Sequence, residues 1–320
     1  MRLSWIRQDA ATQARLLAGR SPYYWNFLKA LPYGATRRLT RSKCRDYGLM
    51  EGFLRNREGL EIGGPSSIFR AGKLIPVYDR CGPIDNSNFS NRTIWDPASS
   101  ANQVGVSYRK QYLAEATDLR EVPDQTYDFV LASHVLEHVA NPMLALQDWR
   151  RVLRQGGTML VIVPDRRANF DHRRAPTSFE HIEADFVRST PEGDLTHVEE
   201  IVALHDLGLD PVAGSAMEFR ERSLKNATIR ALHHHVFTPE VLVRMFSKVG
   251  LQVLSMAIER PWHIIGFARK VGPGASDAQA ENLPFLHKDA EWRKSDPLAE
   301  SGRLARFGSK MIHGFLEGGL

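Results

Sequence analysis

Short apolar runs alternate with helix-like stretches between residues 59 and 270 of the 320-residue chain. We expect strands at the apolar runs 60–62, 74–78, 112–116, 127–132 and 159–163. The last run, MLVIV, is continuously apolar, which is typical of a strand covered on both faces. Strands that alternate with helices predict an α/β fold with a Rossmann-like, doubly wound and mostly parallel sheet.

Two helices and a strand pair have clear local signals. Asn141 and Thr238 each precede a proline, which suits a capping residue followed by the first helical position. The apolar runs 252–258 and 264–267 are separated by only five residues, too few for a parallel crossover. We therefore expect them to form an antiparallel hairpin at the C-terminal end of the sheet.

The chain has a net charge of +5, and the position of this charge decides what it means. Residues 1–58 contain 12 Lys and Arg against 4 Asp and Glu, whereas residues 59–270 contain 24 against 26. The basic character therefore belongs to the N-terminal segment, and the body of the chain is slightly acidic. Overall, 42% hydrophobic and 25% charged residues exclude a chain that is disordered over most of its length.

The patterns divide the chain into three parts. Residues 1–58 are expected to form a basic helical N-terminal segment, 59–270 the main domain, and 271–320 a linker with a helical appendage. Within the main domain, residues 165–235 interrupt the alternation and carry seven of the 12 histidines. This histidine-rich segment follows the fifth strand, so we expect it to fold as a lid over the crevice at the carboxyl ends of the strands.

The sequence favours a cytoplasmic protein. Residues 1–20 lack the apolar core of a secretory signal, and no 18-residue apolar run predicts a membrane span. Cys44 and Cys81 do not indicate a disulfide framework or a metal motif. Aromatic residues among the N-terminal arginines leave open a peripheral contact with anionic lipids.

Candidate ligand-binding residues follow the first predicted strand. Gly63 and Gly64 come directly after it, where glycines let the backbone approach a nucleotide-type ligand, although an ordinary turn would use them too. A ribose-binding carboxylate is expected about 20 residues later. Asp85, 22 residues after Gly63, fits this spacing better than Asp79, and a turn-stabilising role for Asp85 stays open.

The run YDFVLASHVLEHVANPMLALQDWRRVLRQGGTMLVIVP, with GLEIGG upstream, resembles class I S-adenosylmethionine-dependent methyltransferases with a type 11-like core. The resemblance covers about residues 59–165 and resumes at 238–270. It implies that S-adenosylmethionine is the cofactor and that its contacts are Glu61, Gly63, Gly64, Asp85, Asp118, Leu119, Ser133 and His134. In these contacts Asp85 would bind the ribose, Asp118 and Leu119 would flank the adenine, and Ser133 and His134 would lie beside the sulfonium.

The glycine loop departs from the family pattern, G-x-G-x-G. Pro65 and Ser67 stand where the second and third glycines are expected, and proline removes a backbone donor. This departure motivates a rival function, a non-catalytic methyltransferase-fold scaffold that partners a glycosyltransferase. An RNA methyltransferase is a further alternative from the basic N-terminus, but no RNA-binding module is recognisable and we do not expect nucleic acid as a partner.

The histidine-rich segment resembles that of a narrower bacterial group associated with cell-surface polysaccharides, through FDHRRAPTSFEHIEADF, DLTHVEEIVALHD and LHHHVF. This resemblance implies methyl transfer to a hydroxyl of a sugar, polysaccharide precursor or small polar metabolite. Such a transfer needs a base, and the candidates are His134, His172, His233 and His235. Arg173 and Arg174, beside His172, would hold an anionic acceptor. We expect no metal, because His205 lies on an apolar helix face and no HExxH motif occurs. A contact with a membrane or a glycosyltransferase would run through residues 1–58.

Overall fold

The computed structural model describes residues 43–93, 106–272 and 278–299. Most of the basic N-terminal segment and the end of the C-terminal appendage lie outside these ranges, so the expected contact of residues 1–58 with a membrane or a glycosyltransferase stays a prediction. Among the described helices, none combines the length and the apolar character needed to cross a membrane.

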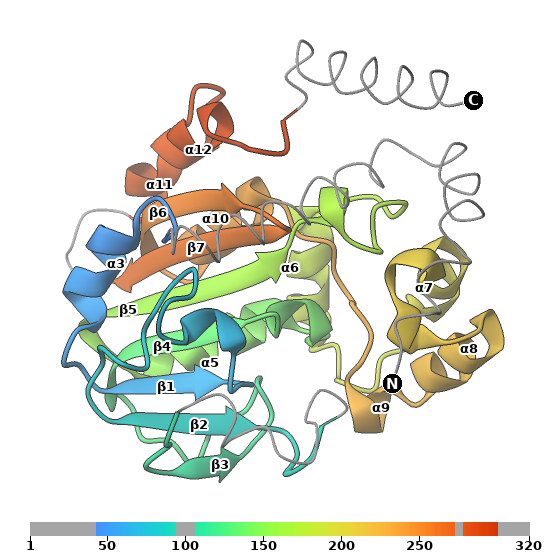
Figure 1. The fold of residues 1–320 in the computed structure, drawn as a ribbon, viewed down its shortest axis with the longest axis horizontal. Coiled ribbons are helices and arrows are strands. Elements are labelled where there is room, and N and C mark those ends of the chain that lie inside the picture. The colour runs from blue at the N-terminus through green and yellow to red at the C-terminus, as the bar shows by residue number, and fades with distance from the viewer. Residues whose placement is uncertain (1–42, 94–105, 273–277, 300–320) are drawn as a thin grey trace, which may run out of the picture.

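Seven strands form one sheet in the order β3-β2-β1-β4-β5-β7-β6 (Figure 1). The strands are β1 (Gly59–Ile62), β2 (Ile84–Asn88), β3 (Gln111–Leu113), β4 (Tyr127–Ser133), β5 (Leu153–Pro164), β6 (Leu251–Glu259) and β7 (His263–Lys270). The first five are parallel, and β7 pairs antiparallel with both β5 and β6. The Rossmann-like sheet and its antiparallel hairpin are therefore confirmed.

Helices cover the sheet and form a separate group beside it (Figure 1). The described α-helices are α3 (Tyr47–Leu54), α5 (Pro142–Val152), α6 (Phe179–Arg188), α7 (Val198–Leu204), α8 (Ala216–Leu224), α9 (Asn226–Ile229), α10 (Pro239–Lys248), α11 (Ala278–Leu286) and α12 (Glu291–Lys294). The caps act as predicted: the Asn141 side chain accepts from the Leu144 amide at 3.1 Å, and Thr238 accepts from Val241 at 3.3 Å.

Two apolar cores lie on opposite faces of the sheet because successive strand residues point to opposite sides. Val130 and Val161 pack on one face with α5 and α10, whereas Leu131 and Leu160 pack on the other with α3. The histidine-rich segment adds a small cluster of its own, formed by Val198, Ile201, Ala213, Phe219 and Leu232. The carboxyl ends of the parallel strands face this segment.

One expected strand is absent, and the sequence patterns missed another. Residues 74–78 form no strand; Leu74, Ile75 and Val77 are buried in irregular chain that packs with α3 on one face of the sheet. The second strand is instead 84–88, whose sequence IDNSN lacks an apolar run. Its polar side chains are buried because other parts of the fold supply hydrogen-bond partners, which sequence periodicity does not reveal.

Candidate active site

A cavity of about 530 Å³ opens at the carboxyl ends of β1, β2 and β4. One side, the strand wall, is formed by the turn after β1 and by residues that follow β2, β3 and β4. The opposite side, the segment wall, belongs to the histidine-rich segment. The strand wall includes Gly63, Gly64, Asn88, Glu115, Ser133, His134, Glu137 and His138; the segment wall includes Asn169, Phe170, Asp210, Arg230 and His233.

The turn after β1 requires glycine at two positions. Gly63 and Gly64 have φ angles of +77° and +66°, in the left-handed region that side chains disfavour. A Cβ on Gly63 would lie 2.6 Å from Val135, and one on Gly64 would lie 2.5 Å from the carboxylate of Glu61. The bare backbone of this turn therefore forms part of the cavity surface.

Glu61 supports the turn from beneath and is not among the described residues that line the cavity. Its carboxylate accepts hydrogen bonds from the hydroxyls of Tyr78, at 2.8 Å, and Tyr108, at 2.7 Å, and from the Ser66 amide, at 3.1 Å. Burial raises the pKa of Glu61, and these hydrogen bonds oppose that shift. The predicted direct contact of Glu61 with cofactor is replaced by a positioning role for the turn.

The ribose contact expected of Asp85 stays a prediction, and the structure gives this residue buried protein partners. It is 2% exposed, makes two hydrogen bonds to Arg109 (3.0 and 2.9 Å) and accepts from the hydroxyl of Tyr127 at 2.7 Å. Although burial opposes ionisation, these hydrogen bonds lower the pKa of Asp85. β2 continues three residues beyond it, so Asn88, at the strand end, lines the cavity instead.

Asp118 and Leu119 also lie away from the described cavity lining. Asp118 forms an ion pair with Arg120 at the surface, and Leu119 is completely buried. The acid after β3 that lines the cavity is Glu115, whose carboxylate lies 2.6 Å from the guanidinium of Arg230. Glu115 stands two residues after β3, and this closeness to the strand end is the signal that could have identified it.

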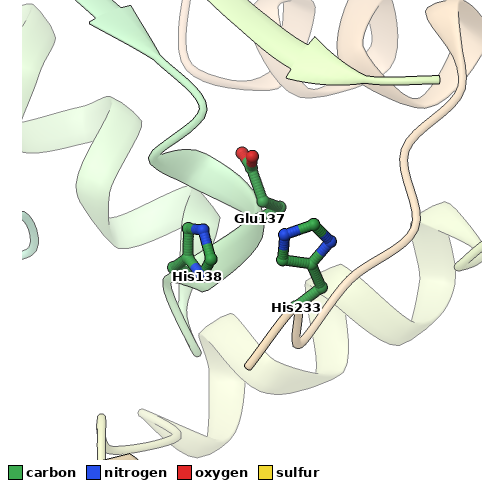
Figure 2. A group of neighbouring side chains, drawn as sticks. All are labelled: Glu137, His138 and His233. Atoms are coloured by element: carbon green, nitrogen blue, oxygen red, sulfur yellow. The ribbon is translucent and has the colours of Figure 1, made fainter. Parts of the chain in front are cut away.

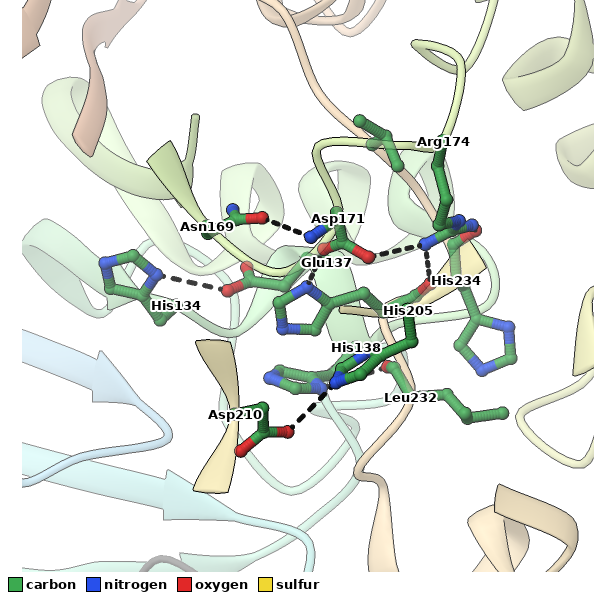
Figure 3. A network of polar contacts seen from close by, with 12 residues as sticks. His134, Glu137, His138, Asn169, Asp171, Arg174, His205, Asp210, Leu232 and His234 are labelled. Carbon is green, nitrogen blue, oxygen red and sulfur yellow. Dashed lines mark hydrogen bonds and ion pairs between the residues drawn. The ribbon is translucent and has the colours of Figure 1, made fainter. Parts of the chain in front are cut away.

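Ser133 and His134 line the cavity at the end of β4, where the sequence placed them. His134 has a φ of +55°, an unusual conformation for a residue with a side chain. One ring nitrogen lies 3.2 Å from Glu137 Oε1 (Figure 3), and the other lies 3.0 Å from His263 Nδ1. Strained backbone of this kind gathers at functional sites because the surrounding packing must hold it.

His233 reaches the cavity from the opposite side. Its Nδ1 lies 2.5 Å from Oδ2 of the buried Asp171, whose other oxygen lies 3.2 Å from the guanidinium of Arg174. Asp171 therefore contacts both the ring and the guanidinium, and Figure 3 shows its contact with Arg174. Burial disfavours the protonated ring, but the charge and hydrogen bond of Asp171 outweigh it and raise the pKa of His233. In the neutral ring, a proton held on Nδ1 by Asp171 leaves Nε2 as the acceptor.

Glu137 and His138 lie beside His233 (Figure 2). The rings of His138 and His233 are 4.7 Å apart between centroids, and His138 Nδ1 lies 3.0 Å from the carbonyl oxygen of Leu232. Burial and the neighbouring His233 lower the pKa of His138 to about 4, so its ring is neutral near pH 7. The cavity thus holds histidines with opposite pKa shifts.

The two other candidate bases, His172 and His235, lie outside the described cavity lining. His172 is buried against Asp206, with a 2.9 Å contact, and His235 Nε2 lies 3.2 Å from the carbonyl oxygen of Ala140. The proposed anion-binding role of Arg174 was also wrong, because its buried guanidinium donates to the carbonyl oxygens of His233 and His234. Arg173 pairs with Asp206 at 3.0 Å.

Residues 88–161 match the family described as "Methyltransferase domain". This segment contains β3, β4 and α5 and ends within β5, so it includes Glu115, Ser133 and His134. No curated protein matches the chain.

Several solved structures are similar at low identity. A SAM-dependent methyltransferase from Aquifex aeolicus is 12% identical over 70% of this chain and 87% of its own, with a TM-score of 0.40. A SAM-dependent methyltransferase from Methanosarcina mazei is 12% identical over 70% of this chain and 97% of its own, with a TM-score of 0.39. The N-methyltransferase NodS from Bradyrhizobium japonicum WM9 is 11% identical over 75% of this chain and 98% of its own, with a TM-score of 0.41. The match of residues 88–161 to a methyltransferase domain, together with the strand order described above, supports a methyltransferase that depends on S-adenosylmethionine.

Proposed function

We propose that this enzyme methylates a hydroxyl of a sugar, a polysaccharide precursor or another small polar metabolite, with His233 as the proton acceptor. The observation that carries the proposal is the cavity with two unlike walls. Bare backbone and strand ends form one wall, and a histidine oriented by a buried carboxylate stands on the other.

The strand wall fits S-adenosylmethionine, which supplies an electrophilic methyl group when bound. Gly63 and Gly64 give the backbone access that a ligand needs, and Asn88 offers amide donors and an acceptor to ribose hydroxyls. Glu115 is the carboxylate placed to accept from the adenine amino group. Ser133 and His134, at the end of β4, line the same cavity.

The segment wall fits the acceptor side of the reaction. A hydroxyl that attacks a methyl carbon must lose its proton, and a base within hydrogen-bond reach contributes to the rate. His233 supplies Nε2 for that proton, and Asp171 holds the ring in the tautomer and orientation that expose it. Asn169, Asp210 and Arg230 on the segment wall offer polar groups to the hydroxyls of an acceptor, beside apolar residues such as Phe170.

The experiment is a transfer assay with radiolabelled S-adenosylmethionine and a panel of free sugars, nucleotide sugars and polysaccharide fragments. We expect label in a hydroxylated acceptor and a loss of kcat by about 10²- to 10⁴-fold in His233→Gln. The cofactor Kd of this variant should stay unchanged. His287→Gln, at an exposed position, is the matched control. Transfer by His233→Gln at the wild-type rate would refute the role of His233.

One observation favours the non-catalytic alternative. The Ser66 amide in the glycine loop already donates to Glu61 and Tyr78, and Pro65 has no amide hydrogen, so neither is offered to a ligand. If the protein is a non-catalytic scaffold, we expect no heat of binding when S-adenosylmethionine is titrated into the pure chain at millimolar concentration. A saturable heat would exclude that alternative.

A further inference from the structure

A second group of histidines lies apart from the cavity, where three parts of the histidine-rich segment meet. His181 and Asp185 stand one turn apart on α6, His197 immediately precedes α7, and His235 belongs to the chain that leads to α10. None of the four is among the described residues that line the cavity. Asp185 and His235 are buried, while His181 and His197 are partly exposed.

The donor atoms of these residues converge. His181 Nε2 lies 3.1 Å from His197 Nε2 and 3.1 Å from Asp185 Oδ2, and His235 Nε2 lies 3.9 Å from the same carboxylate oxygen. Ligand atoms around a tetrahedral zinc ion, at bonds of about 2.0–2.1 Å, are separated by about 3.4 Å. The ligand atoms of His181, Asp185 and His235 all lie within 4.8 Å of one another, and His197 Nε2 lies 3.1 Å from His181 Nε2. Imidazole and carboxylate groups are ligands that zinc prefers.

Asp185 Oδ2 is a buried acceptor that the fold leaves unsatisfied. Within the described part of the chain it has no hydrogen-bond partner, although the His181 nitrogen is only 3.1 Å away. The contact is close but lacks hydrogen-bond geometry. A buried carboxylate oxygen without a partner is costly, and a cation bound between the two groups removes that cost.

The atoms around the cluster hold the carboxylate in place. The other oxygen, Asp185 Oδ1, accepts from Arg188 and from the hydroxyl of Thr190, each at 3.0 Å. His235 Nδ1 is also buried without a partner among the described residues. Metal ligands in proteins are commonly oriented by such outer hydrogen bonds.

The group of Glu137, His138 and His233 differs from this cluster (Figure 2). In that group His233 Nδ1 is held by Asp171, His138 Nδ1 by the Leu232 carbonyl and Glu137 Oε1 by His134, while Glu137 Oε2 has no partner among the described residues. In the second cluster, one such contact is that of His235 Nε2 with the Ala140 carbonyl, at 3.2 Å. It also lines the cavity and serves the proposed acceptor side. Its residues therefore provide a control for the second cluster.

We propose that His181, Asp185, His197 and His235 bind one zinc ion that ties α6, the start of α7 and the chain before α10 together. Four protein ligands complete a tetrahedral shell, which is the arrangement of a structural rather than a catalytic zinc ion. The ion fixes His235, two residues from His233, and so holds the segment wall in place. The sequence-based expectation of no metal is thereby revised, and the proposal does not depend on the identity of the methyl acceptor.

The test measures zinc directly in the full chain, prepared without a polyhistidine tag from zinc-supplemented medium. Elemental analysis should find about one zinc ion per chain, and His197→Gln and Asp185→Asn should each retain less than about a tenth of it. His233→Gln and His287→Gln should keep the full amount. Cobalt(II) in the stripped wild-type chain should give the intense visible absorption of a four-coordinate ion.

Two further results decide the proposal without any activity assay. A chelator should lower the Tm of the wild-type chain and leave that of His197→Gln unchanged, since this variant holds no ion to lose. Because His197 is partly exposed, its replacement leaves the core intact even where Asp185→Asn fails to fold. A wild-type chain that contains no zinc and takes up none on titration with zinc chloride overturns the proposal, and so does full zinc content in His197→Gln.

Discussion

The two walls of the cavity are organised by different kinds of interaction. The strand wall is positioned by backbone pairing: register fixes Ile62 beside Ala132 and Ser87, and two apolar cores fix the sheet. The segment wall has only a small apolar cluster and is positioned by buried polar groups such as Arg174, which joins Asp171 to two backbone carbonyls. Backbone pairing thus builds the wall that we propose for the cofactor, and buried polar contacts build the wall that we propose for the acceptor.

The largest effect should come from the segment wall. Asp171→Asn removes the charge that orients His233, so we expect kcat to fall by about 10²- to 10⁴-fold with little change in cofactor Kd. Steady-state kinetics and calorimetry measure the two quantities. Asp206→Asn is the matched control, because it removes a carboxylate from the buried His172 pair outside the cavity. A similar kcat in both variants would contradict the assigned role of Asp171.

An intermediate effect is expected at the glycine turn. Gly64→Ala places a Cβ against the Glu61 carboxylate, so the turn must shift and the cofactor Kd should rise by at least about 10-fold, or about 1.4 kcal/mol. Gly72→Ala is the control, because Gly72 has a similar φ of +72° but open space around it. Both variants carry the same backbone strain, and only Gly64→Ala should weaken cofactor binding. Equal cofactor affinity in the two variants would show that this turn does not take part in cofactor binding.

The smallest expected effect on cofactor Kd distinguishes the role of Asn88 from that of Asp85. Asn88→Ala should raise the cofactor Kd by about three- to ten-fold, the effect of about one hydrogen bond. Asp85→Asn should leave this Kd within about two-fold but lower the free energy of unfolding by about 1 kcal/mol, because Arg109 loses a charged partner. Titration calorimetry measures the cofactor Kd, and thermal unfolding measures the change in the free energy of unfolding. The opposite pattern would restore Asp85 as the ribose-binding residue.

Sequence rules were sufficient where local interactions decide the structure. The caps at Asn141 and Thr238, the continuously apolar run in β5 and the five-residue connection of the hairpin all depend on neighbours in the sequence. They were insufficient for β2, whose Asp85 is buried only because Arg109 and Tyr127, from other parts of the fold, satisfy it. The apolar residues at 74–78 pack in a core and do not pair as a strand.

The histidines show more clearly that sequence rules fail where tertiary contacts decide the role of a residue. In the run His233 to His235, the first reaches the cavity, the second lies 3.0 Å from the Asn226 side chain and the third lies beside the carbonyl of Ala140. Their chemical identity is the same, so only the tertiary partners assign them different roles. The metal-ligand spacing of the second cluster arises in the same way, from three segments that the sequence keeps apart.

The most direct test of the account is a crystal structure of the enzyme with S-adenosylhomocysteine. We expect the product to lie against Gly63 and Gly64, with its adenine near Glu115 and its sulfur facing His233 across a space that admits an acceptor hydroxyl. A product bound elsewhere, or one whose sulfur faces away from the segment wall, would contradict the assignment of the two walls.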